Sequence, residues 1–462
     1  MTELIYWNGI ASELWFNPLL ATAAEESESG NSSLVLAGVL LSLVIIYFAS
    51  KLGGEICARI DLPPVLGELV GGVLVGISAF HLLVFPESGS TADDSLIISF
   101  LQQTGGLTPE ATPAVFDSLS EVISLLSELG VIILLFEIGL ESDLKELIRV
   151  GPQAALVAVV GVVAPFAAGT AGLVYLFAVP VVPAIFAGAA LTATSIGITA
   201  KVLAELGQIS SKEGQIIIGA AVLDDILGIV VLAVVANLVK TGEIEITNVV
   251  LLMISAGAFL IGSIVIGRLI SPFIVGLVNE MKTRGQLLLT GLVFAFVLSY
   301  IANVIQLEAI LGAFAAGLIL AETDKRKELE EQVIPVADIF VPIFFVCVGA
   351  KTDISVLNPT IPANREGLVI AAFLIVVAIL GKMITGFTMV GQSDINKLAI
   401  GVGMIPRGEV GLVFAGVGSA SGALSESTEA AIIMMVILTT FIAPPLLRIV
   451  FKEPEEVTES SS

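Results

Sequence analysis

The stretch that decides the fold is Gln215–Asn237, which reads QIIIGAAVLDDILGIVVLAVVAN. It is long enough to cross a bilayer as a helix, and its only charges are the adjacent carboxylates Asp224 and Asp225. A carboxylate near the bilayer centre costs about 2.5–3.5 kcal/mol on insertion scales, so we expect this pair to face protein or water and to be functional. The alternative, two aspartates capping a helix break, is disfavoured because residues 220–231 contain no Pro and one Gly. The pair predicts a site that handles cations within the membrane.

The composition of the whole chain indicates an integral membrane protein. Of its 462 residues, 56% are hydrophobic and 14% are charged. The net charge of −23 argues against a polybasic surface for nucleic acid, and no Gly-rich phosphate fingerprint follows a strand-like run. We therefore expect no nucleic acid, nucleotide or cofactor, and a protein that is not an enzyme.

The cysteines and the histidine exclude other sites. Cys57 and Cys347 lie in apolar segments, which favours small buried hydrophobes over a disulfide or metal site. With the single histidine His81, the chain offers neither a zinc centre nor a histidine cluster that senses pH.

Apolar windows of about 20 residues predict an all-α polytopic protein with about 13 membrane spans. The spans are Leu34–Ser50, Leu62–Phe85, Leu119–Leu140, Pro152–Phe177, Val181–Leu203, Gln215–Val239, Thr247–Ile270, Gln286–Ala302, Leu307–Ala321, Val336–Gly349, Gly367–Val390, Leu398–Ser419 and Glu429–Phe451. Residues 1–33 resemble a signal peptide at Leu20–Ala24 but lack its basic segment, so we expect an interfacial lead-in outside the membrane.

Basic residues predict the orientation of the chain. An odd number of spans puts most Lys and Arg in one set of loops, whereas the other set contains only Lys240, Lys351 and Arg365. By the positive-inside rule, the N-terminus is outside and the tail 452–462 is cytoplasmic. Lys382 and Arg407 fall inside predicted spans, so both need partners.

The parity of the spans predicts two inverted repeats, residues 34–246 and 271–451, joined by a linker helix at 247–270. Two spans at matching positions should be discontinuous. The fifth has hydroxyls at Thr194, Ser195 and Thr199 around a Gly, and the twelfth reads GVGMIPRGEVG over 401–411. Broken helices supply backbone carbonyls and helix-end dipoles, and hydroxyls add oxygen ligands for a hard cation. The alternative for the hydroxyls is ordinary hydrogen bonding between membrane helices.

Four motifs resemble those of the bacterial NapA-type sodium/proton antiporters, within the monovalent cation:proton antiporter family. They are ATSIGITA at 193–200, GAAVLDD at 219–225, ILGK at 379–382 and GMIPRGEVG at 403–411, and the resemblance runs from about Leu34 to Arg448. It implies a core (transport) domain, with helices at about 152–239 and 367–451, beside a dimerisation domain. It further implies a homodimer among the lipids of a bacterial inner or internal membrane, exchanging Na⁺ or Li⁺ for H⁺ electrogenically by alternating access in pH homeostasis.

The resemblance also implies roles for single residues. Asp225 would bind sodium and proton in turn, Asp224 would pair with Lys382, and Thr194 and Ser195 would lie near the ion. Elementary electrostatics agrees, because burial favours a neutral carboxyl whereas a nearby ammonium favours the ionised form, so the two aspartates should differ.

Arg407 and Glu409 are two positions apart and so would not stack on one helix face. We expect them in a structural ion network that neutralises helix ends, rather than in contact with the ion. Glu137 is notable because it lies deep in an apolar run.

Two other functions stay open. A potassium/proton antiporter or potassium efflux transporter of the same fold commonly has Gln in place of the first aspartate and a cytosolic regulatory domain, whereas this chain has Asp224 and no such domain in its sequence. A channel or a non-transporting sensor is the less favoured alternative, because inverted broken helices and a paired lysine would be unexpected in either.

Overall fold

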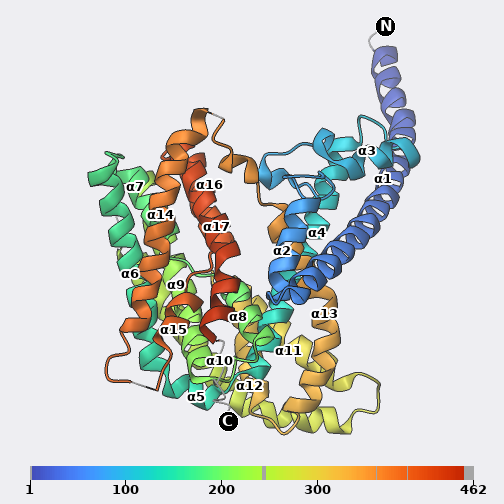
Figure 1. Cartoon of the computed structure of the whole chain (residues 1–462). Coiled ribbons are helices and arrows are strands. Elements are labelled where there is room, and N and C mark those ends of the chain that lie inside the picture. Colours follow the sequence, from blue (N-terminus) through green and yellow to red (C-terminus); the bar gives the residue numbers. More distant parts are fainter. Residues whose placement is uncertain (1–2, 242–245, 361, 393, 452–462) are drawn as a thin grey trace.

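The computed structural model describes residues 3–241, 246–360, 362–392 and 394–451, and the regular structure in these ranges is entirely helical (Figure 1). Three helices, η1 to η3, are 3₁₀ helices of one turn. In chain order the elements are α1 Glu3–Arg59, α2 Pro64–Val75, η1 Pro86–Ser88, η2 Ala92–Asp94, α3 Leu96–Thr104, α4 Thr112–Glu141, α5 Leu144–Arg149, α6 Gly151–Leu176, α7 Val181–Ala190, α8 Ile196–Glu205, α9 Lys212–Thr241, α10 Ile246–Glu280, α11 Gln286–Val304, α12 Ala309–Ala321, α13 Arg326–Ala350, η3 Ile354–Leu357, α14 Pro362–Phe387, α15 Lys397–Gly403, α16 Glu409–Ala420 and α17 Glu426–Phe451.

The helices account for the predicted membrane spans. Among the described residues, nine helices are long and apolar enough to cross a bilayer. The short apolar helices α2 and α12 lie at two further predicted positions, and the pairs α7–α8 and α15–α16 lie at the remaining two. The prediction of an all-α membrane protein with two discontinuous helices is therefore confirmed.

Several predicted boundaries were wrong. The second span ends at Val75 rather than Phe85, because at Gly76 the chain meets the backbone of Ala350 so closely that a Cβ would not fit. Helix α13 begins at Arg326, ten residues before the predicted span, since its first turns are charged and extend beyond the apolar segment. Helix α10 likewise continues to Glu280, and α1 runs without a break from the predicted lead-in into the first span.

The spans form two bundles (Figure 1). Helices α6 to α9 and α14 to α17 pack together, and α1, α2, α4 and α11 to α13 form the second bundle. The packing repeats between the halves of the chain: α1 lies on α2 as α11 lies on α12, α4 lies on α12 as α13 lies on α2, and α6 lies on α9 as α14 lies on α17. This is the pattern expected of two structural repeats.

Glycines allow the two central crossings of the second bundle. Gly72 of α2 lies against the backbone of α13, and Gly139 of α4 lies against the backbone of α12. A side chain at either glycine would collide with main-chain atoms, so small residues are what lets these membrane helices approach so closely.

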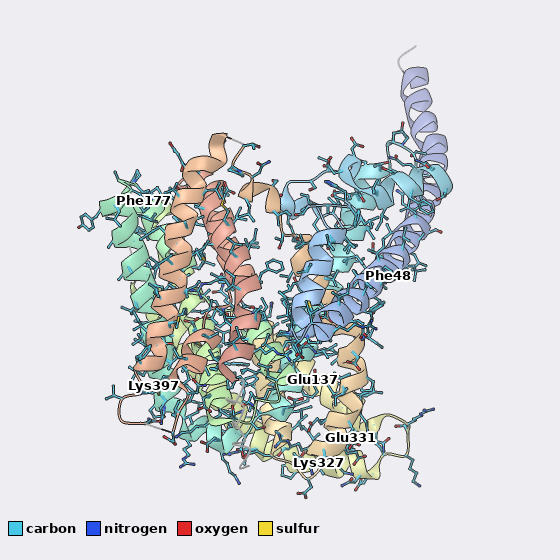
Figure 2. The ribbon with its side chains drawn as sticks, in the orientation of Figure 1. Phe48, Glu137, Phe177, Lys327, Glu331 and Lys397 are labelled. Atoms are coloured by element: carbon cyan, nitrogen blue, oxygen red, sulfur yellow. The ribbon has the colours of Figure 1, made fainter. Side chains whose placement is uncertain are left out.

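Side chains labelled in Figure 2 mark the two ends of the molecule. Lys327, Glu331 and Lys397 lie towards one end, whereas Phe177 lies near the opposite end. Phe48, on α1, is 68% exposed and faces outward from the second bundle, as expected for a side chain that contacts lipid. The protein is thus an integral membrane protein.

Candidate functional site

The first bundle is built around two helix breaks. Helix α7 ends at Ala190 and α8 begins at Ile196, where Ser195 caps the new helix by accepting from the Ile198 amide. Helix α15 ends at Gly403 and α16 begins at Glu409. Pro406 between them cannot donate a backbone hydrogen bond and disfavours helical geometry before it, which explains the second break.

Hydrogen bonds join the two breaks. The Ser195 amide donates to the Pro406 carbonyl at 2.9 Å, and Thr194 Oγ1 donates to the Met404 carbonyl at 3.2 Å. The approach requires glycine at position 408, because a Cβ there would lie 2.8 Å from Ser195 Oγ. The breaks therefore cross. Backbone carbonyls that have no partner within their own helix at the second break accept hydrogen bonds from residues of the first break.

Thr199 adds a further bond to the crossing. Its Oγ1 donates to the Gly403 carbonyl at 3.0 Å, and the side chain is buried. Of the predicted hydroxyls, Thr194 and Thr199 thus bind backbone across the crossing, and Ser195 caps α8.

A buried ion pair lies beside the crossing. Lys382 Nζ on α14 lies 3.1 Å from Asp224 Oδ2 and 3.3 Å from Asp224 Oδ1 on α9, and neither side chain is exposed. The ammonium also donates to the Thr192 carbonyl at 2.7 Å. Gly161 of α6 makes room for it, since a Cβ there would lie 3.2 Å from Nζ. Removing both charges from water costs free energy, and this cost is offset only because the pair has additional hydrogen bonds.

Asp225 lies next to this pair but on another face of α9. Consecutive helical residues point about 100° apart, so Asp225 cannot share the surroundings of Asp224. Asp225 is 3% exposed. Ile229, one turn further along the face of Asp225, lines a cavity between the bundles.

This cavity, which we term the interbundle cavity, has a volume of about 1130 Å³. Helices α4 and α13 line it from one bundle, and α16 and α17 line it from the other. Its inner end reaches Gly408 and Thr440, and Thr440 Oγ1 donates to the Arg407 carbonyl at 2.5 Å. The interbundle cavity therefore extends from one face of the protein to the crossing.

The bundles contact each other on the opposite side of the crossing. Glu205, at the end of α8, accepts from the Val65 amide in the first turn of α2, at 3.1 and 3.4 Å to its two oxygens. The positive charge of Lys201 interacts favourably with the carboxylates of Glu68, Glu137 and Glu205. Glu137, labelled in Figure 2, thus belongs to a group of charges between the bundles.

Arg407 lies fully buried at the crossing. Its Nη1 donates to the carbonyls of Ala193 at 2.9 Å and Met404 at 3.4 Å, which belong to the two breaks. Among the described residues, Nε and Nη2 have no hydrogen-bond partner. The side chain of the predicted partner Glu409 lies outside the described part, and only its position at the start of α16 is known.

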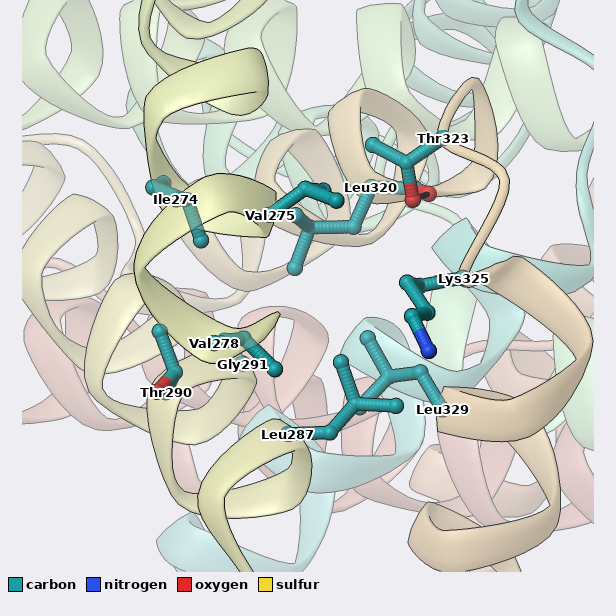
Figure 3. A pocket seen from close by; sticks show the side chains of 10 residues that line it. All are labelled: Ile274, Val275, Val278, Leu287, Thr290, Gly291, Leu320, Thr323, Lys325 and Leu329. Atoms are coloured by element: carbon teal, nitrogen blue, oxygen red, sulfur yellow. Dashed lines mark hydrogen bonds between the residues drawn. The ribbon is translucent and has the colours of Figure 1, made fainter. Parts of the chain in front are cut away.

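Other features of the described residues do not suggest a second ion site. A small hollow lined by α10, α11 and α12, with Lys325 at its edge, has a volume of about 10 Å³ and is mostly apolar (Figure 3). That is scarcely room for one water molecule. No group of three His, Cys, Asp or Glu residues in the described ranges could hold a metal ion, and Cys57 and Cys347 are both free and buried.

Comparison with known proteins agrees with this geometry. The family model for "Sodium/hydrogen exchanger, transmembrane" matches residues 34–453, which is most of the chain. The chain belongs to the sodium/hydrogen exchanger family. The sequence resemblance to sodium/proton antiporters is thereby confirmed at the level of the family.

Named relatives of this exchanger include a cyanobacterial protein. The high-affinity Na⁺/H⁺ antiporter NhaS3 of Synechocystis is 70% identical over 457 residues, covering 98% of each chain. The Na⁺/H⁺-K⁺ antiporter GerN of Bacillus cereus is 32% identical and covers 91% of this chain and 98% of its own. The structure of the sodium proton antiporter MjNhaP1 from Methanocaldococcus jannaschii matches with a TM-score of 0.55 at 16% identity, over 91% of this chain and 96% of that one, which shows a shared fold.

Sequence reasoning missed several residues around the crossing. Thr192 accepts from Lys382 through its carbonyl, and Thr440 binds the backbone of Arg407. Neither could have been found, because a main-chain acceptor leaves no signal in sequence and a lone Thr in an apolar helix is common. Glu205 had a weak signal, since a carboxylate near the end of an apolar helix needs a partner.

Proposed function

We propose that this chain exchanges Na⁺ for H⁺ across the membrane, with Asp225 as the carboxylate that binds the two in turn. The observation that carries the proposal is the buried Asp224–Lys382 pair beside Asp225, at a crossing of broken helices reached by the interbundle cavity. Lys382 neutralises Asp224, and Asp225 lies on another face of α9, so the two carboxylates can take different roles, with Asp225 as the one that binds the transported ion. Thr194 and Ser195 lie at the same crossing and support a role close to the ion.

Exchange follows from competition for one carboxylate. When Asp225 holds either sodium or a proton it is neutral, and the first bundle can carry it past the second at low cost. When Asp225 binds neither ion it is charged, and moving this charge across the membrane is unfavourable. The first bundle therefore rarely returns without an ion, which couples the transport of Na⁺ to that of H⁺. Lys382 would make the cycle electrogenic if its ammonium gives up a proton when sodium binds nearby.

The wider assembly is part of the proposal. We expect residues about 152–239 and 367–451 to form the moving core, and residues 34–246 and 271–451 to be inverted repeats joined by a linker at 247–270, which lies within α10. We expect a homodimer in a bacterial inner or internal membrane, with the N-terminus outside and the tail at 452–462 in the cytoplasm. The interbundle cavity would then open outward, because Glu87 and Lys351 at its mouth belong to the predicted outer loops.

A transport assay tests the proposal. In proteoliposomes with an imposed pH gradient, adding NaCl should dissipate the gradient, LiCl should act similarly, and choline chloride should do nothing. The apparent affinity for Na⁺ should weaken as the pH falls, because protons compete for the same carboxylate. A gradient that Na⁺ does not dissipate at any pH would refute the proposal.

Potassium/proton exchange is the second candidate. It is favoured by the relative GerN, whose name includes K⁺, although Asp224 in place of a neutral residue favours sodium. The same assay with KCl separates the two: a KM for K⁺ at or below that for Na⁺ would make this chain a potassium/proton antiporter.

A further inference from the structure

Lys351 lies at the mouth of the interbundle cavity, directly after α13. Its Nζ is 2.6 Å from Glu87 Oε2 of η1 and donates to Ser124 Oγ of α4 at 3.4 Å. It also lies 4.8 Å from the centre of the Phe85 ring, a cation–π contact. Three side chains, two around the start of η1 and one on α4, therefore hold this ammonium in one place.

The charges that line the interbundle cavity are unbalanced. Lys351 is the one cation among its described lining residues, whereas five are carboxylates: Glu87, Glu128, Glu308, Asp353 and Glu429. A cleft of one sign concentrates counter-ions. A divalent cation is concentrated far more than a monovalent one, because its Boltzmann factor is the square of that for a single charge.

We propose that Lys351 determines ion specificity by holding the potential of the interbundle cavity at a level where Na⁺ enters but Ca²⁺ and Mg²⁺ do not accumulate. Oxygen-lined sites of carboxylates and carbonyls are what these divalent ions prefer. Without Lys351, Glu87 would be released and the surplus of negative charge would grow by one. The inference rests on the proposed function, since it takes the interbundle cavity as the path of the ion to Asp225.

The geometry separates this role from a structural one. The Lys351 side chain is 29% exposed and that of Glu87 is 63% exposed. An ion pair so open to solvent adds little to stability, so removing its charge should leave the fold intact. Loss of the Lys351 charge instead changes the electrostatic potential in the interbundle cavity.

The test uses Lys351→Gln, Glu87→Gln and the double variant, with Lys351→Arg as the control that keeps the charge. Exchange is measured in right-side-out and inside-out membrane vesicles, with the KM for Na⁺ and the inhibition constant for Ca²⁺ taken on each face. For Lys351→Gln we expect the KM for Na⁺ to fall about two- to tenfold on the cavity face. The Ca²⁺ inhibition constant should fall by about the square of that factor.

Four further results are expected. The opposite face keeps its wild-type constants, the Arg control behaves like wild type, and the double variant returns towards wild type because the net charge of the lining is restored. Raising the ionic strength with choline chloride should shrink the effect of Lys351→Gln, since charges in open water are screened within about 10 Å at 0.1 M salt.

Two outcomes would overturn the inference: unchanged Ca²⁺ inhibition in Lys351→Gln, or a double variant that matches Lys351→Gln rather than wild type. The latter would mean that the geometry of the pair matters and its charge does not. Failure of the proposed function would look different, because the wild-type vesicles themselves would show no exchange driven by Na⁺.

Discussion

At the residue scale, the adjacent aspartates have different surroundings although they share a helix and a depth. Asp224 has Lys382 at 3.1 Å, and Asp225 is turned to another face. Asp224 thus has a buried counter-ion, whereas Asp225 lies on the face of α9 whose next turn, at Ile229, lines the interbundle cavity. Helix geometry alone accounts for this difference in surroundings.

Replacing Asp225 with Asn should abolish exchange and leave expression and folding intact. The amide keeps the volume of the carboxyl but can hold neither a proton nor a cation in alternation. Exchange is measured by dissipation of a pH gradient in proteoliposomes, and folding by thermal unfolding. Asp225→Glu is the control that keeps the charge with altered reach, and it should retain reduced exchange. Near-normal transport by the Asn variant would disprove the role.

Replacing Lys382 with Ala should lower the free energy of unfolding by about 3–5 kcal/mol, because Asp224 is left buried without a counter-ion. Thermal unfolding of the purified protein measures this, and Lys327→Ala, an exposed lysine, is the control that should change little. Lys382→Gln tests electrogenicity: it should exchange ions with less response to an imposed membrane potential than wild type. Wild-type exchange that ignores the potential would make Lys382 a structural tie only.

At the element scale, the linker helix α10 is tied to the end of α12. Arg268 donates through Nε and Nη2 to the two carboxylate oxygens of Glu322, at 2.5 and 2.7 Å. This fork-to-fork geometry makes the pair stronger than a single contact of the same exposure. The bond to Arg268 lowers the pKa of Glu322.

The pair predicts a pH-dependent stability. A carboxyl whose folded pKa is depressed stabilises the fold above its unfolded pKa of about 4.3, and that contribution is lost as the pH falls through the folded value. Glu322→Gln should therefore lower stability at pH 7 by up to about 1 kcal/mol, since the pair is partly exposed. The difference between the variant and wild type should shrink as the pH falls from the unfolded pKa through the depressed folded pKa of Glu322. Thermal unfolding between pH 3 and 8 measures this, and a difference that grows in acid would contradict it.

At the scale of the whole molecule, the bundles are apart on one side of the crossing and in contact on the other. The interbundle cavity occupies the open side, and Glu205 bound to the Val65 amide marks the closed side. Since Glu205 belongs to the proposed moving bundle and Val65 to the other, this bond must break when the first bundle moves. It therefore favours the state with the open cavity.

Replacing Glu205 with Gln should shift the protein away from that state. The amide oxygen of Gln can still accept from the Val65 amide but carries no charge, and a hydrogen bond to a charged group is worth about 1 kcal/mol more than a neutral one, so the population should change about fivefold. The measurement is the labelling rate of Leu412→Cys, which lines the interbundle cavity, by an impermeant thiol reagent in a background without Cys57 and Cys347. Labelling should slow in the Glu205→Gln variant.

Glu213 offers a matched control for this experiment. Its Oε1 accepts from the Asn396 amide at 2.7 Å, which is the same kind of bond but within one bundle. Glu213→Gln should leave the labelling rate unchanged. An equal slowing in both variants, or no slowing in the Glu205→Gln variant, would contradict a role for Glu205 in the balance between states.

The sequence by itself determined the number and approximate position of the spans, the two helix breaks and the four intramembrane charges at Asp224, Asp225, Lys382 and Arg407. These follow from local properties: apolar runs must be helical in lipid, Gly and Pro interrupt them, and an intramembrane charge needs a partner. The pairing of Asp224 with Lys382 was also predicted, through the resemblance and the repeat.

Only the tertiary structure decided the other contacts between distant parts of the chain. The end of α2 at Val75, the Glu205–Val65 bond and the Lys351–Glu87 pair all join residues far apart in sequence, and each depends on how closely two backbones approach. Hydropathy shows which segments are apolar enough to lie in lipid. These contacts depend instead on how the helices pack against one another. Sequence does not show this packing, because residues that face lipid and residues buried between helices are both apolar.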